Sequence, residues 1–506
     1  MKYTNPILPG FHPDPSICRV GDDFYLITST FEFFPGVPIY HSKNLVNWEL
    51  INYCLTENSQ LSLKRGKPSS GIYAPTLRYH DGTFFMTATN VTRGGNFIVH
   101  TKDIRGKWSE PAWVRQAGID PSLFWDDDGT CYFVSNGSEH PIRDGNGIFL
   151  CEIDPMTGKL LSPSRRISNG CGGRCPEAPH IYKRNGRYYL MLAEGGTEYG
   201  HMVTIQRARN IYGPYENCPH NPLLTHRDDP GPIQSTGHAD IVEDPNGNWW
   251  LVCLGIRPLP GVMLHHLGRE TFLAPLTWQE DGWPTVGRNR ELDFEMDGPL
   301  PGPAPHPISL DFEEHFESDV LNLRWNFVRN PKRECYRPEK GRLVMIAGED
   351  TLSTPRGTPT MIAVRQQAFR METVARLTGD IQIAQCAGLT AFYNNDYHYD
   401  ILITREEDGK HCVCLRKHVA DIDVVVARHP IDYRGAIRLK IESDEEWYTF
   451  CYEKDGDYVV LGRGRTSLLC TEITHTMTFT GTYWGVFTEG GEIDVTDVSV
   501  REVKPM

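Results

Sequence analysis

Hydrophobic and polar residues alternate with a period of two in short runs along the chain, a pattern typical of β-strands. Five of these runs are rich in aromatic residues, and each opens with an Asp or Asn of the kind that favours tight turns. The five runs read DDFYLITST from Asp22, DGTFFMTAT from Asp81, DGTCYFVSN from Asp128, NGRYYLMLA from Asn185 and NGNWWLVCL from Asn246. The pattern therefore predicts five related strands, each preceded by a turn.

A second, shorter motif precedes each aromatic run at a nearly constant distance. The five copies are Asp14-Pro-Ser-Ile, Ala74-Pro-Thr-Leu, Asp120-Pro-Ser-Leu, Ala178-Pro-His-Ile and His238-Ala-Asp-Ile. Successive copies begin 60, 46, 58 and 60 residues apart, which suits a four-stranded propeller blade with its loops. We therefore predict a five-bladed β-propeller over residues 1–295.

The composition changes at a proline-dense segment, PGPAPHP at residues 301–307, which is typical of a stiff linker. Beyond it, short alternating runs resume, separated by polar turns at intervals suited to a β-sandwich. The sequence thus predicts an all-β protein with a linker at 296–307 and a second, sandwich domain at 308–506.

Charge and targeting signals narrow the range of partners. The net charge of −14 argues against nucleic acid and anionic membranes, because both require a basic face on the protein. The N-terminal residues contain no apolar run of signal-peptide length, and no uncharged apolar stretch is long enough to span a membrane. We expect a cytoplasmic protein.

The 14 cysteines fit scattered reduced thiols better than a disulfide framework in a long chain without a signal peptide. Cys171 and Cys175 form a close pair, but no second pair follows at a spacing that would complete a zinc site.

The repeat indicates where the functional residues of the protein lie. In a propeller the first strand of each blade lines the central channel, and the tetrads are the candidates for these strands. Asp14, Asp120 and His238 begin three tetrads, and Glu177 directly precedes a fourth. Taken singly, an Asp before Pro is often a turn former and a lone His is often a core residue. Carboxylates converging on one channel are costly without a function.

Paired carboxylates in a cleft are the apparatus of glycoside hydrolysis, in which one donates a proton to the leaving oxygen and the other activates water or attacks. A third carboxylate can position the sugar and raise the pKa of the acid, because a like charge nearby disfavours ionisation.

Several longer motifs together resemble glycoside hydrolase family 43, in its two-domain β-xylosidase and α-L-arabinofuranosidase form. They are NPILPGFHPDPSI, TSTFEFFPGVPIYHSKNLVNW, SGIYAPTLRY, GIDPSLFWDDDG, CPEAPHIY, AEGGT, GHADIV and LGRETFLAP. The resemblance implies that the sandwich is a concanavalin-like jelly roll. It also implies an exo-acting, inverting enzyme that releases terminal α-L-arabinofuranose or β-D-xylose from xylan, arabinoxylan or related hemicellulose oligosaccharides.

The resemblance implies separate roles for the three carboxylates. Asp14 resembles the general base, Glu177 the general acid, and Asp120 the residue that orients the sugar and tunes the acid. An inverting enzyme requires a base–acid separation of roughly 6.5–9.5 Å, which leaves room for a water molecule.

Four more residues resemble parts of a pocket for the terminal sugar. Arg269 of LGRET resembles an arginine that contacts the sugar hydroxyls and the carboxylates, Phe31 and Tyr73 resemble aromatic walls, and Phe479 of the second domain resembles a residue that narrows the pocket. Related β-xylosidases usually have Trp at the positions of Phe33 and Tyr73. We expect these two departures to bear on the choice of sugar.

The resemblance requires no cofactor, but His238 of GHAD resembles a histidine that holds Ca²⁺ or another divalent ion through water in some members. We treat it as a tentative metal site, and we leave a homo-oligomer open. Three alternatives remain at this point: a catalytically inactive carbohydrate-binding propeller, a retaining hydrolase of fructosides, and a scaffolding propeller.

Overall fold

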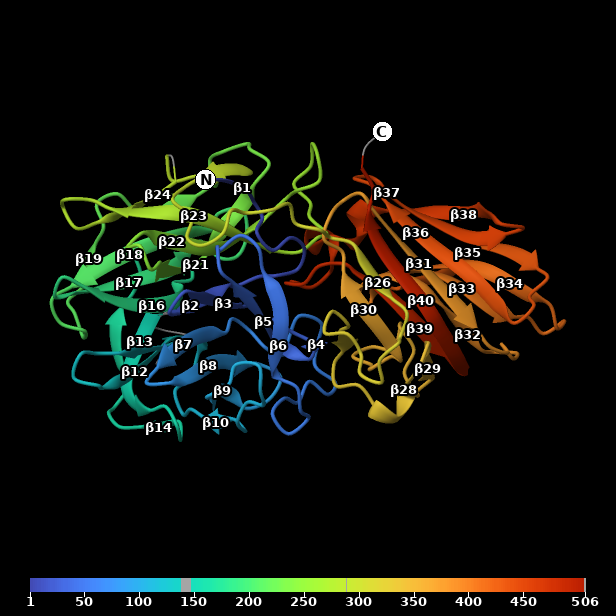
Figure 1. The fold of residues 1–506 in the computed structure, drawn as a ribbon, viewed down its shortest axis with the longest axis horizontal. Coiled ribbons are helices and arrows are strands. Elements are labelled where there is room, and N and C mark those ends of the chain that lie inside the picture. The colour runs from blue at the N-terminus through green and yellow to red at the C-terminus, as the bar shows by residue number, and fades with distance from the viewer. Residues whose placement is uncertain (138–146, 288, 505–506) are drawn as a thin grey trace.

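The computed structural model describes residues 1–137, 147–287 and 289–504, which form two all-β bodies lying side by side (Figure 1). In these residues the helical elements are three short 3₁₀ turns: η1 (Arg333–Cys335), η2 (Thr466–Leu469) and η3 (Thr471–Ile473). No helix in the described ranges has the length and apolar character needed to cross a membrane.

In the described residues the N-terminal body contains five antiparallel sheets of four or five strands, and each sequence repeat forms one of them. The first sheet comprises β2 (Ser16–Val20), β3 (Asp23–Ile27), β5 (Gly36–Ser42) and β6 (Glu49–Leu55). The second comprises β7 (Thr76–His80), β8 (Thr83–Asn90), β9 (Gly95–Thr101) and β10 (Ala112–Trp113). The third comprises β11 (Ile119–Trp125), β12 (Cys131–Gly137), β13 (Gly147–Asp154), β14 (Lys159–Leu160) and β15 (Arg165–Ser168).

The last two sheets follow the same plan. The fourth comprises β16 (Glu177–Arg184), β17 (Arg187–Glu194), β18 (Met202–Ala208), β19 (Glu216–Asn217) and β20 (Leu224–Thr225). The fifth comprises β21 (Gln234–Glu243), β22 (Trp249–Ile256), β23 (Glu270–Trp278) and β24 (Pro284–Val286). In every sheet the tetrad overlaps the first strand, and the aromatic run overlaps the second.

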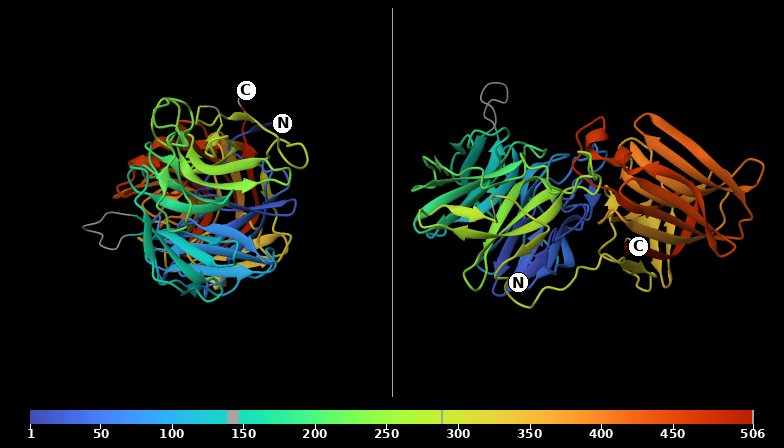
Figure 2. Two further views of the ribbon diagram at one scale, coloured as in Figure 1. Left: turned by 90° about the vertical axis from the view of Figure 1, so that its left-hand side faces the viewer. Right: turned by 90° about the horizontal axis from the view of Figure 1, so that it is seen from above.

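The first strands of the five sheets contact one another in a cycle. β2 contacts β7, β7 contacts β11, β11 contacts β16, β16 contacts β21, and β21 returns to β2. In the left-hand view of Figure 2 the propeller faces the viewer, with the second body behind it. This closed arrangement brings the tetrads to one axis, as a β-propeller requires.

A buried carboxylate ties several sheets together at this axis. Asp240 on β21 is fully buried and accepts hydrogen bonds from Ser16 Oγ at 2.7 Å and Tyr182 Oη at 2.6 Å. Arg78 binds it with both terminal nitrogens, at 2.7 and 3.1 Å. The four residues come from four different sheets, so one salt-bridged cluster links the first, second, fourth and fifth sheets.

Turn chemistry explains two of the hairpins directly. Asp81 and Gly82 have φ of 45° and 76°, and Asn185 and Gly186 have φ of 49° and 70°. Left-handed conformations at both central residues are typical of the type I′ turn, which suits the twist of the flanking strands. The Asp-Gly and Asn-Gly pairs of the repeat therefore have a local structural cause.

The segment after the propeller is held against its surface. β25 (Glu295–Asp297) pairs with β1 (Lys2–Thr4), so pairing with the propeller continues two residues past the expected boundary at 295. Beyond it, Asn47 Nδ2 donates to the carbonyl of His306 at 2.8 Å. A side chain at Gly302, whose φ is 66°, would lie 2.2 Å from the carbonyl oxygen of Lys43. Glycine is required there because the two backbones approach so closely.

The C-terminal body is a sandwich of two antiparallel sheets, as expected from its alternating runs. One sheet comprises β26 (Phe312–Glu314), β28 (Tyr336–Glu339), β29 (Arg342–Ile346), β31 (Met371–Thr378), β36 (Ala436–Ser443), β37 (Trp447–Lys454), β38 (Asp457–Arg465) and β40 (Glu492–Glu502). The other comprises β30 (Met361–Arg365), β32 (Cys386–Asn394), β33 (Tyr397–Arg405), β34 (His411–Val419), β35 (Ile422–Ile431) and β39 (Tyr483–Glu489). A continuous apolar core lies between them.

The two bodies share an interface that is partly apolar core and partly backbone pairing. β4 (Phe33–Phe34) of the propeller pairs with β27 (Phe327–Val328) of the second body. The ring of Phe33 stacks on that of Tyr483, with centroids 4.0 Å apart. A propeller followed by a β-sandwich is thus confirmed, and the two bodies pack as a unit.

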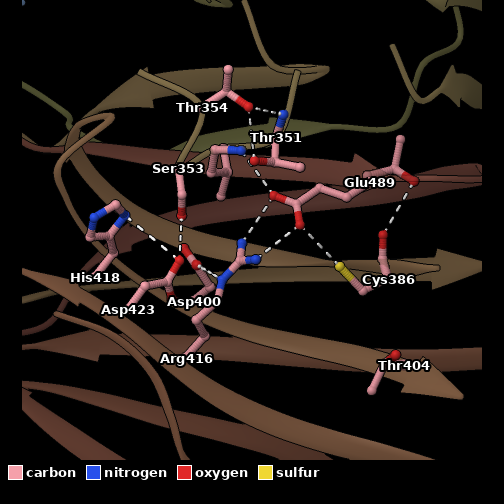
Figure 3. Close-up of polar contacts among 12 residues, drawn as sticks. Thr351, Ser353, Thr354, Cys386, Asp400, Thr404, Arg416, His418, Asp423 and Glu489 are labelled. Atoms are coloured by element: carbon pink, nitrogen blue, oxygen red, sulfur yellow. Dashed lines mark hydrogen bonds and ion pairs between the residues drawn. The ribbon is translucent and has the colours of Figure 1, made fainter. Parts of the chain in front are cut away.

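A polar network on the second sheet of the sandwich fixes the loop that precedes β30 (Figure 3). Arg416 binds Asp400 at 2.7 Å and both carboxylate oxygens of Glu489 at 2.9 and 3.0 Å. Glu489 in turn accepts the backbone N–H of Leu352 at 2.9 Å, and Ser353 donates to Asp423 at 2.9 Å. Leu352 is thereby held, fully buried, in the apolar cluster shared with the propeller.

Each of the 14 cysteines lies in the described ranges and is a free thiol. Most are buried in strands, and burial raises the pKa of several of these thiols, for example that of Cys18 to about 12.

Candidate active site

The propeller axis opens into a cavity of about 240 Å³ next to the second body. All eight site residues expected from the sequence line it: Asp14, Phe31, Tyr73, Asp120, Glu177, His238, Arg269 and Phe479. A larger cavity of about 800 Å³ lies between the two bodies and contains none of them. The volume of the first is below the range of drug-sized ligand pockets, so it suits a single sugar ring.

The backbone at the tetrads is strained in a repeated way. Asp14, Asp120, Ala178 and His238 all have φ between 49° and 54°, in the left-handed region. The strands at Asp120, Ala178 and His238 are also irregular in register. Non-glycine residues rarely adopt this conformation, and bulges next to active sites redirect side chains. The repeat therefore encodes a bend that presents these residues at the axis.

Asp14 is held as an ionised carboxylate. It is 3% exposed and accepts hydrogen bonds from Ser29 Oγ and from Arg269 Nη1, the latter at 2.9 Å. His238 Nδ1 lies 3.6 Å from Asp14 Oδ1. Burial alone would raise the pKa of Asp14, but Arg269, His238 and the Ser29 hydrogen bond outweigh it and lower that pKa below its usual value.

The pKa values of Asp120 and Glu177 are shifted in the opposite direction from that of Asp14. Burial is the largest cause of the raised pKa in both, and it raises that of Glu177 to about 7 with help from the charge of Asp14. The charges of Glu177 and Asp14 push the pKa of Asp120 well above its usual value. Asp120 Oδ2 also accepts the backbone N–H of Ala178 at 3.3 Å, which fixes the strand beginning at Glu177.

Aromatic rings form the apolar wall of the cavity. Phe31 lies 5.2 Å from Tyr73 and 5.4 Å from Phe479, centroid to centroid. The guanidinium of Arg269 lies over the rings of Phe31 and Phe479 at 5.4 and 5.5 Å. Phe479 comes from the second body and is anchored by its backbone N–H, which donates to Ser69 Oγ at 2.8 Å.

Unlike Tyr73, Phe33 lies outside the cavity. Its side chain is fully buried against Tyr483 and Phe11 at the interface of the two bodies and does not line the cavity. The backbone explains this: Phe31 precedes β4 and has a φ of 48°, in the left-handed region, so the chain bends there. Phe31 reaches the cavity wall while Phe33 enters the interface core. Of the two departures expected to bear on the choice of sugar, Tyr73 is the one in the site.

Five of the other lining residues have polar or long side chains that were not identified from the sequence as parts of the site: Arg174, Thr197, Glu198, His201 and Met477. Thr197 belongs to the AEGGT motif, and its hydroxyl accepts from Arg269 Nη1 at 3.0 Å. Arg174 and Glu198 form an ion pair of 2.9 Å at the edge of the cavity. Thr197 could have been found from the sequence, because it belongs to a family motif. Arg174, Glu198, His201 and Met477 lie in loops without a repeated pattern.

His238 lies beside Asp14, as described above, and burial lowers its pKa. In the described part of the chain, no three His, Cys, Asp or Glu side chains are grouped so that they could hold a metal ion directly. An ion at His238 would therefore take most of its ligands from water, and the calcium site stays a prediction.

The arrangement combines an ionised carboxylate and a carboxyl that is protonated up to about neutral pH in one cavity. These are the states required of a general base and a general acid in glycoside hydrolysis. Arg269 also lines the cavity, where its Nη1 donates to Asp14 and to Thr197.

Two protein-family models match the chain. The model for glycosyl hydrolases family 43 matches residues 3–284, and the model for the beta xylosidase C-terminal concanavalin A-like domain matches residues 313–497.

Curated relatives align over most of their length. A non-reducing end alpha-L-arabinofuranosidase from Bacteroides ovatus is 41% identical over 96% of this chain and 91% of its own. A beta-xylosidase from Bacillus subtilis is 36% identical over 90% of each chain. Among solved structures, Bacteroides ovatus Xyloglucan PUL GH43B superposes with a TM-score of 0.93 at 38% identity, covering 99% of this chain and 100% of that chain.

Proposed function

Since the chain belongs to glycosyl hydrolases family 43, we propose that it is an exo-acting, inverting glycosidase that releases terminal α-L-arabinofuranose and β-D-xylose from hemicellulose oligosaccharides. The observation that carries the proposal is the cavity that holds Asp14 with a lowered pKa and Glu177 with a pKa of about 7. Relatives of similar length are named for one or both of these activities.

In the proposed reaction, Glu177 donates its proton to the glycosidic oxygen as the bond to the anomeric carbon breaks. Asp14 accepts a proton from a water molecule, whose oxygen attacks the anomeric carbon from the opposite face. One water is consumed and the released sugar has inverted configuration. No hydrogen bond joins Asp14 to Glu177 among the described residues, which is compatible with a water between them.

The shape of the cavity supports cleavage at chain ends. Phe31 and Phe479 close one side of a volume suited to a single ring, so a sugar with extensions on both sides has no room. Arg269 and Thr197 provide polar contacts for hydroxyl groups, and the aromatic wall provides a surface for the apolar face of the ring.

The contacts and protonation states of the carboxyl groups argue against a retaining enzyme and against a sugar-binding module without catalysis. A retaining enzyme needs two carboxyl groups close enough for one to attack the sugar directly, yet Asp14 is engaged by Arg269 and Ser29. A sugar-binding module without catalysis does not need two carboxyl groups in opposite protonation states.

If Ca²⁺ binds near His238 as the resemblance suggests, it would add positive charge beside Asp14. The reaction proposed above uses only side chains of the chain and water.

The test compares the wild type with Asp14→Asn and Glu177→Gln on nitrophenyl α-L-arabinofuranoside and nitrophenyl β-D-xylopyranoside. We expect kcat to fall by at least about 10³-fold for each variant, and NMR of wild-type hydrolysis of an oligosaccharide to show the inverted anomer first. Asp127→Asn, at an exposed ion pair, is the matched control. Unchanged turnover in both variants would contradict the proposed roles, and initial retention would contradict the mechanism.

A further inference from the structure

We propose that the large cavity between the two bodies (the interbody cavity) is a second binding site, and that its ligand is a small carboxylate anion with an apolar body, such as an aromatic acid. Arg324 and Arg365 attract the carboxylate, and the apolar lining holds the body. The site is separate from the cavity at the propeller axis that contains Asp14 and Glu177 (the sugar pocket), because the two cavities share no described lining residue. The proposal therefore does not rest on the glycosidase function.

The interbody cavity lies where three parts of the chain meet. Its volume of about 800 Å³ is within the range of small-molecule sites, which occur preferentially at domain interfaces. Residues of β5 and β6 line it from the propeller, residues of β30 and β40 line it from the sandwich, and the segment 306–324 contributes the rest of the lining. A molecule in this cavity therefore contacts both bodies.

Apolar side chains make up most of the lining, and part of this apolar surface faces water. Trp48 and Phe312 supply aromatic rings. Val320 is 72% exposed, and Leu323 and Ile308 are 41% and 36% exposed. Apolar surface gathered in an open cavity is typical of ligand-binding grooves, because a ligand with an apolar body removes it from water.

Arg365, on β30, brings a buried positive charge to the cavity. The residue is 8% exposed, and its Nε donates to the carbonyl of Phe11 at 2.8 Å. Its guanidinium lies over the rings of Phe11 and Tyr483 at 5.9 and 5.7 Å, and it forms no ion pair with a carboxylate of the described residues. A buried charge without a counter-charge is costly. An anion in the cavity lowers this cost even without touching Arg365, because charges interact over several ångströms where little water intervenes.

The polar side chains next to Arg365 are neutral. His12 Nδ1 lies 2.9 Å from the carbonyl oxygen of Pro9, and its Nε2 lies 2.8 Å from Tyr40 Oη. Burial and the charge of Arg365 lower the pKa of His12 well below its usual value, so its ring is uncharged at neutral pH. Burial raises the pKa of Tyr40, so its hydroxyl stays protonated. Neither side chain offsets the charge of Arg365.

Arg324 supplies an accessible positive charge to the same cavity. It is exposed, its Nη1 donates to the carbonyl of Asp311 at 3.0 Å, and its guanidinium lies over the ring of Phe312 at 5.3 Å. Within the described ranges it has no carboxylate partner. The charges of Arg365 and Arg324 both oppose the rise that burial causes in the pKa of Tyr40. The two guanidinium groups therefore act on one part of the cavity.

The acidic content of the lining is small. Among the described lining residues the one carboxylate is that of Glu49, which is exposed and lies 3.8 Å from Arg105, outside the cavity. The lining thus has an excess of positive charge on a protein whose net charge is −14. Positive charge in a crevice with apolar walls attracts anions. A carboxylate suits the two guanidinium groups, and the apolar walls favour an organic acid over a strongly hydrated inorganic anion.

The experiment measures binding to the full chain by calorimetry at pH 7. The probes are cinnamate, its uncharged amide cinnamamide, and inorganic phosphate. We expect cinnamate to bind, and the other two to bind at least about tenfold more weakly, because cinnamamide lacks the charge and phosphate lacks the apolar body. No binding of cinnamate, or an equal affinity for either of the other probes, would overturn the proposal.

Arg324→Gln tests the location of the site. We expect the Kd for cinnamate to rise at least about tenfold, while kcat/KM on nitrophenyl β-D-xylopyranoside stays unchanged because Arg324 lies outside the sugar pocket. Arg19→Gln is the matched control. Arg19 also donates to a backbone carbonyl, that of Gly21 at 2.8 Å, and has no ion pair in the part of the chain that the structure describes. Its substitution should leave the Kd unchanged, and an unchanged Kd in Arg324→Gln would overturn the proposal.

Kinetic measurements distinguish the interbody cavity from the sugar pocket. Competitive inhibition of pentoside hydrolysis by cinnamate that persists in Arg324→Gln would place the acid in the sugar pocket and overturn the proposal. The calorimetric measurement does not depend on turnover. A wild type that binds cinnamate as expected but hydrolyses no pentoside would therefore contradict the proposed function and still support this site.

Discussion

At the scale of single residues, the site derives its chemistry from different environments around identical functional groups. Asp14 and Asp120 begin equivalent tetrads with nearly equal φ, yet the pKa of the first is lowered and that of the second is raised. The difference lies in their partners, since Arg269 binds Asp14 directly while Asp120 faces the charges of Glu177 and Asp14. Position in the repeat sets where a carboxylate lies, and its neighbours set its protonation.

The pH profile follows from these directions. The reaction needs Asp14 ionised and Glu177 protonated, so kcat/KM should be lost as pH falls below the lowered pKa of Asp14 and as it rises through about 7, the pKa of Glu177. Arg174 lowers the pKa of Glu177. In Arg174→Ala the alkaline limb, measured on a nitrophenyl pentoside, should therefore move to higher pH while the acid limb stays in place. An alkaline limb that stays fixed or moves to lower pH would contradict the assignment of Glu177 as the general acid.

At the scale of elements, the pocket depends on a segment of the second body that reaches the propeller. η3 and the residues that follow it carry Met477 and Phe479, which line the cavity. Glu472 in η3 accepts from the backbone N–H of His265 at 3.0 Å, contacts its ring at 2.7 Å, and accepts from Tyr199 Oη at 3.2 Å. One carboxylate therefore links the cavity wall to two propeller loops.

Removing this link should affect substrate binding more than chemistry. We expect Glu472→Ala to raise KM about tenfold on nitrophenyl pentosides with a smaller change in kcat, because the wall loses its anchor while Asp14 and Glu177 keep their contacts. Glu472→Gln retains acceptors for His265 and Tyr199 and should recover most of the affinity. A fall in kcat at constant KM would contradict a positioning role for Glu472.

At the scale of the whole molecule, two features hold the distant parts together. The cluster around Asp240 joins four of the five propeller sheets, and the interface of Phe33 with Tyr483 joins the two bodies. Burial would raise the pKa of Asp240, but Arg78 and its other partners lower it far below its usual value. Its contribution to stability is thus present above pH about 4 and is lost only as pH falls through the lowered pKa.

Asp240→Asn should lower the free energy of unfolding by about 3 kcal/mol or more, because it leaves the Arg78 guanidinium partly buried without its carboxylate. Chemical denaturation of the full chain at pH 7 measures this change. Asp127→Asn breaks an exposed ion pair with Lys183 and should change the stability by less than about 1 kcal/mol. Similar effects of the two substitutions would contradict a central role for Asp240.

The architecture of the chain was accessible from its sequence to a large extent. Strand alternation, Asp-Gly and Asn-Gly turns and the recurring tetrad are local patterns, and each corresponds to one structural unit, so they predicted the propeller and its axial residues. The placement of Asp14, Asp120 and Glu177 in one cavity follows from that repetition.

What the sequence by itself determined is the order of strands, the two-body organisation and which residues face the axis, because these follow from periodicity and turn chemistry within each repeat. Only the tertiary structure decided that Phe33 enters the interface while Phe479 reaches Phe31, and that Arg174 and Glu198 border the site. It also decided the opposite pKa shifts of Asp14 and Glu177. These features depend on burial and on contacts between segments hundreds of residues apart, which no local pattern encodes.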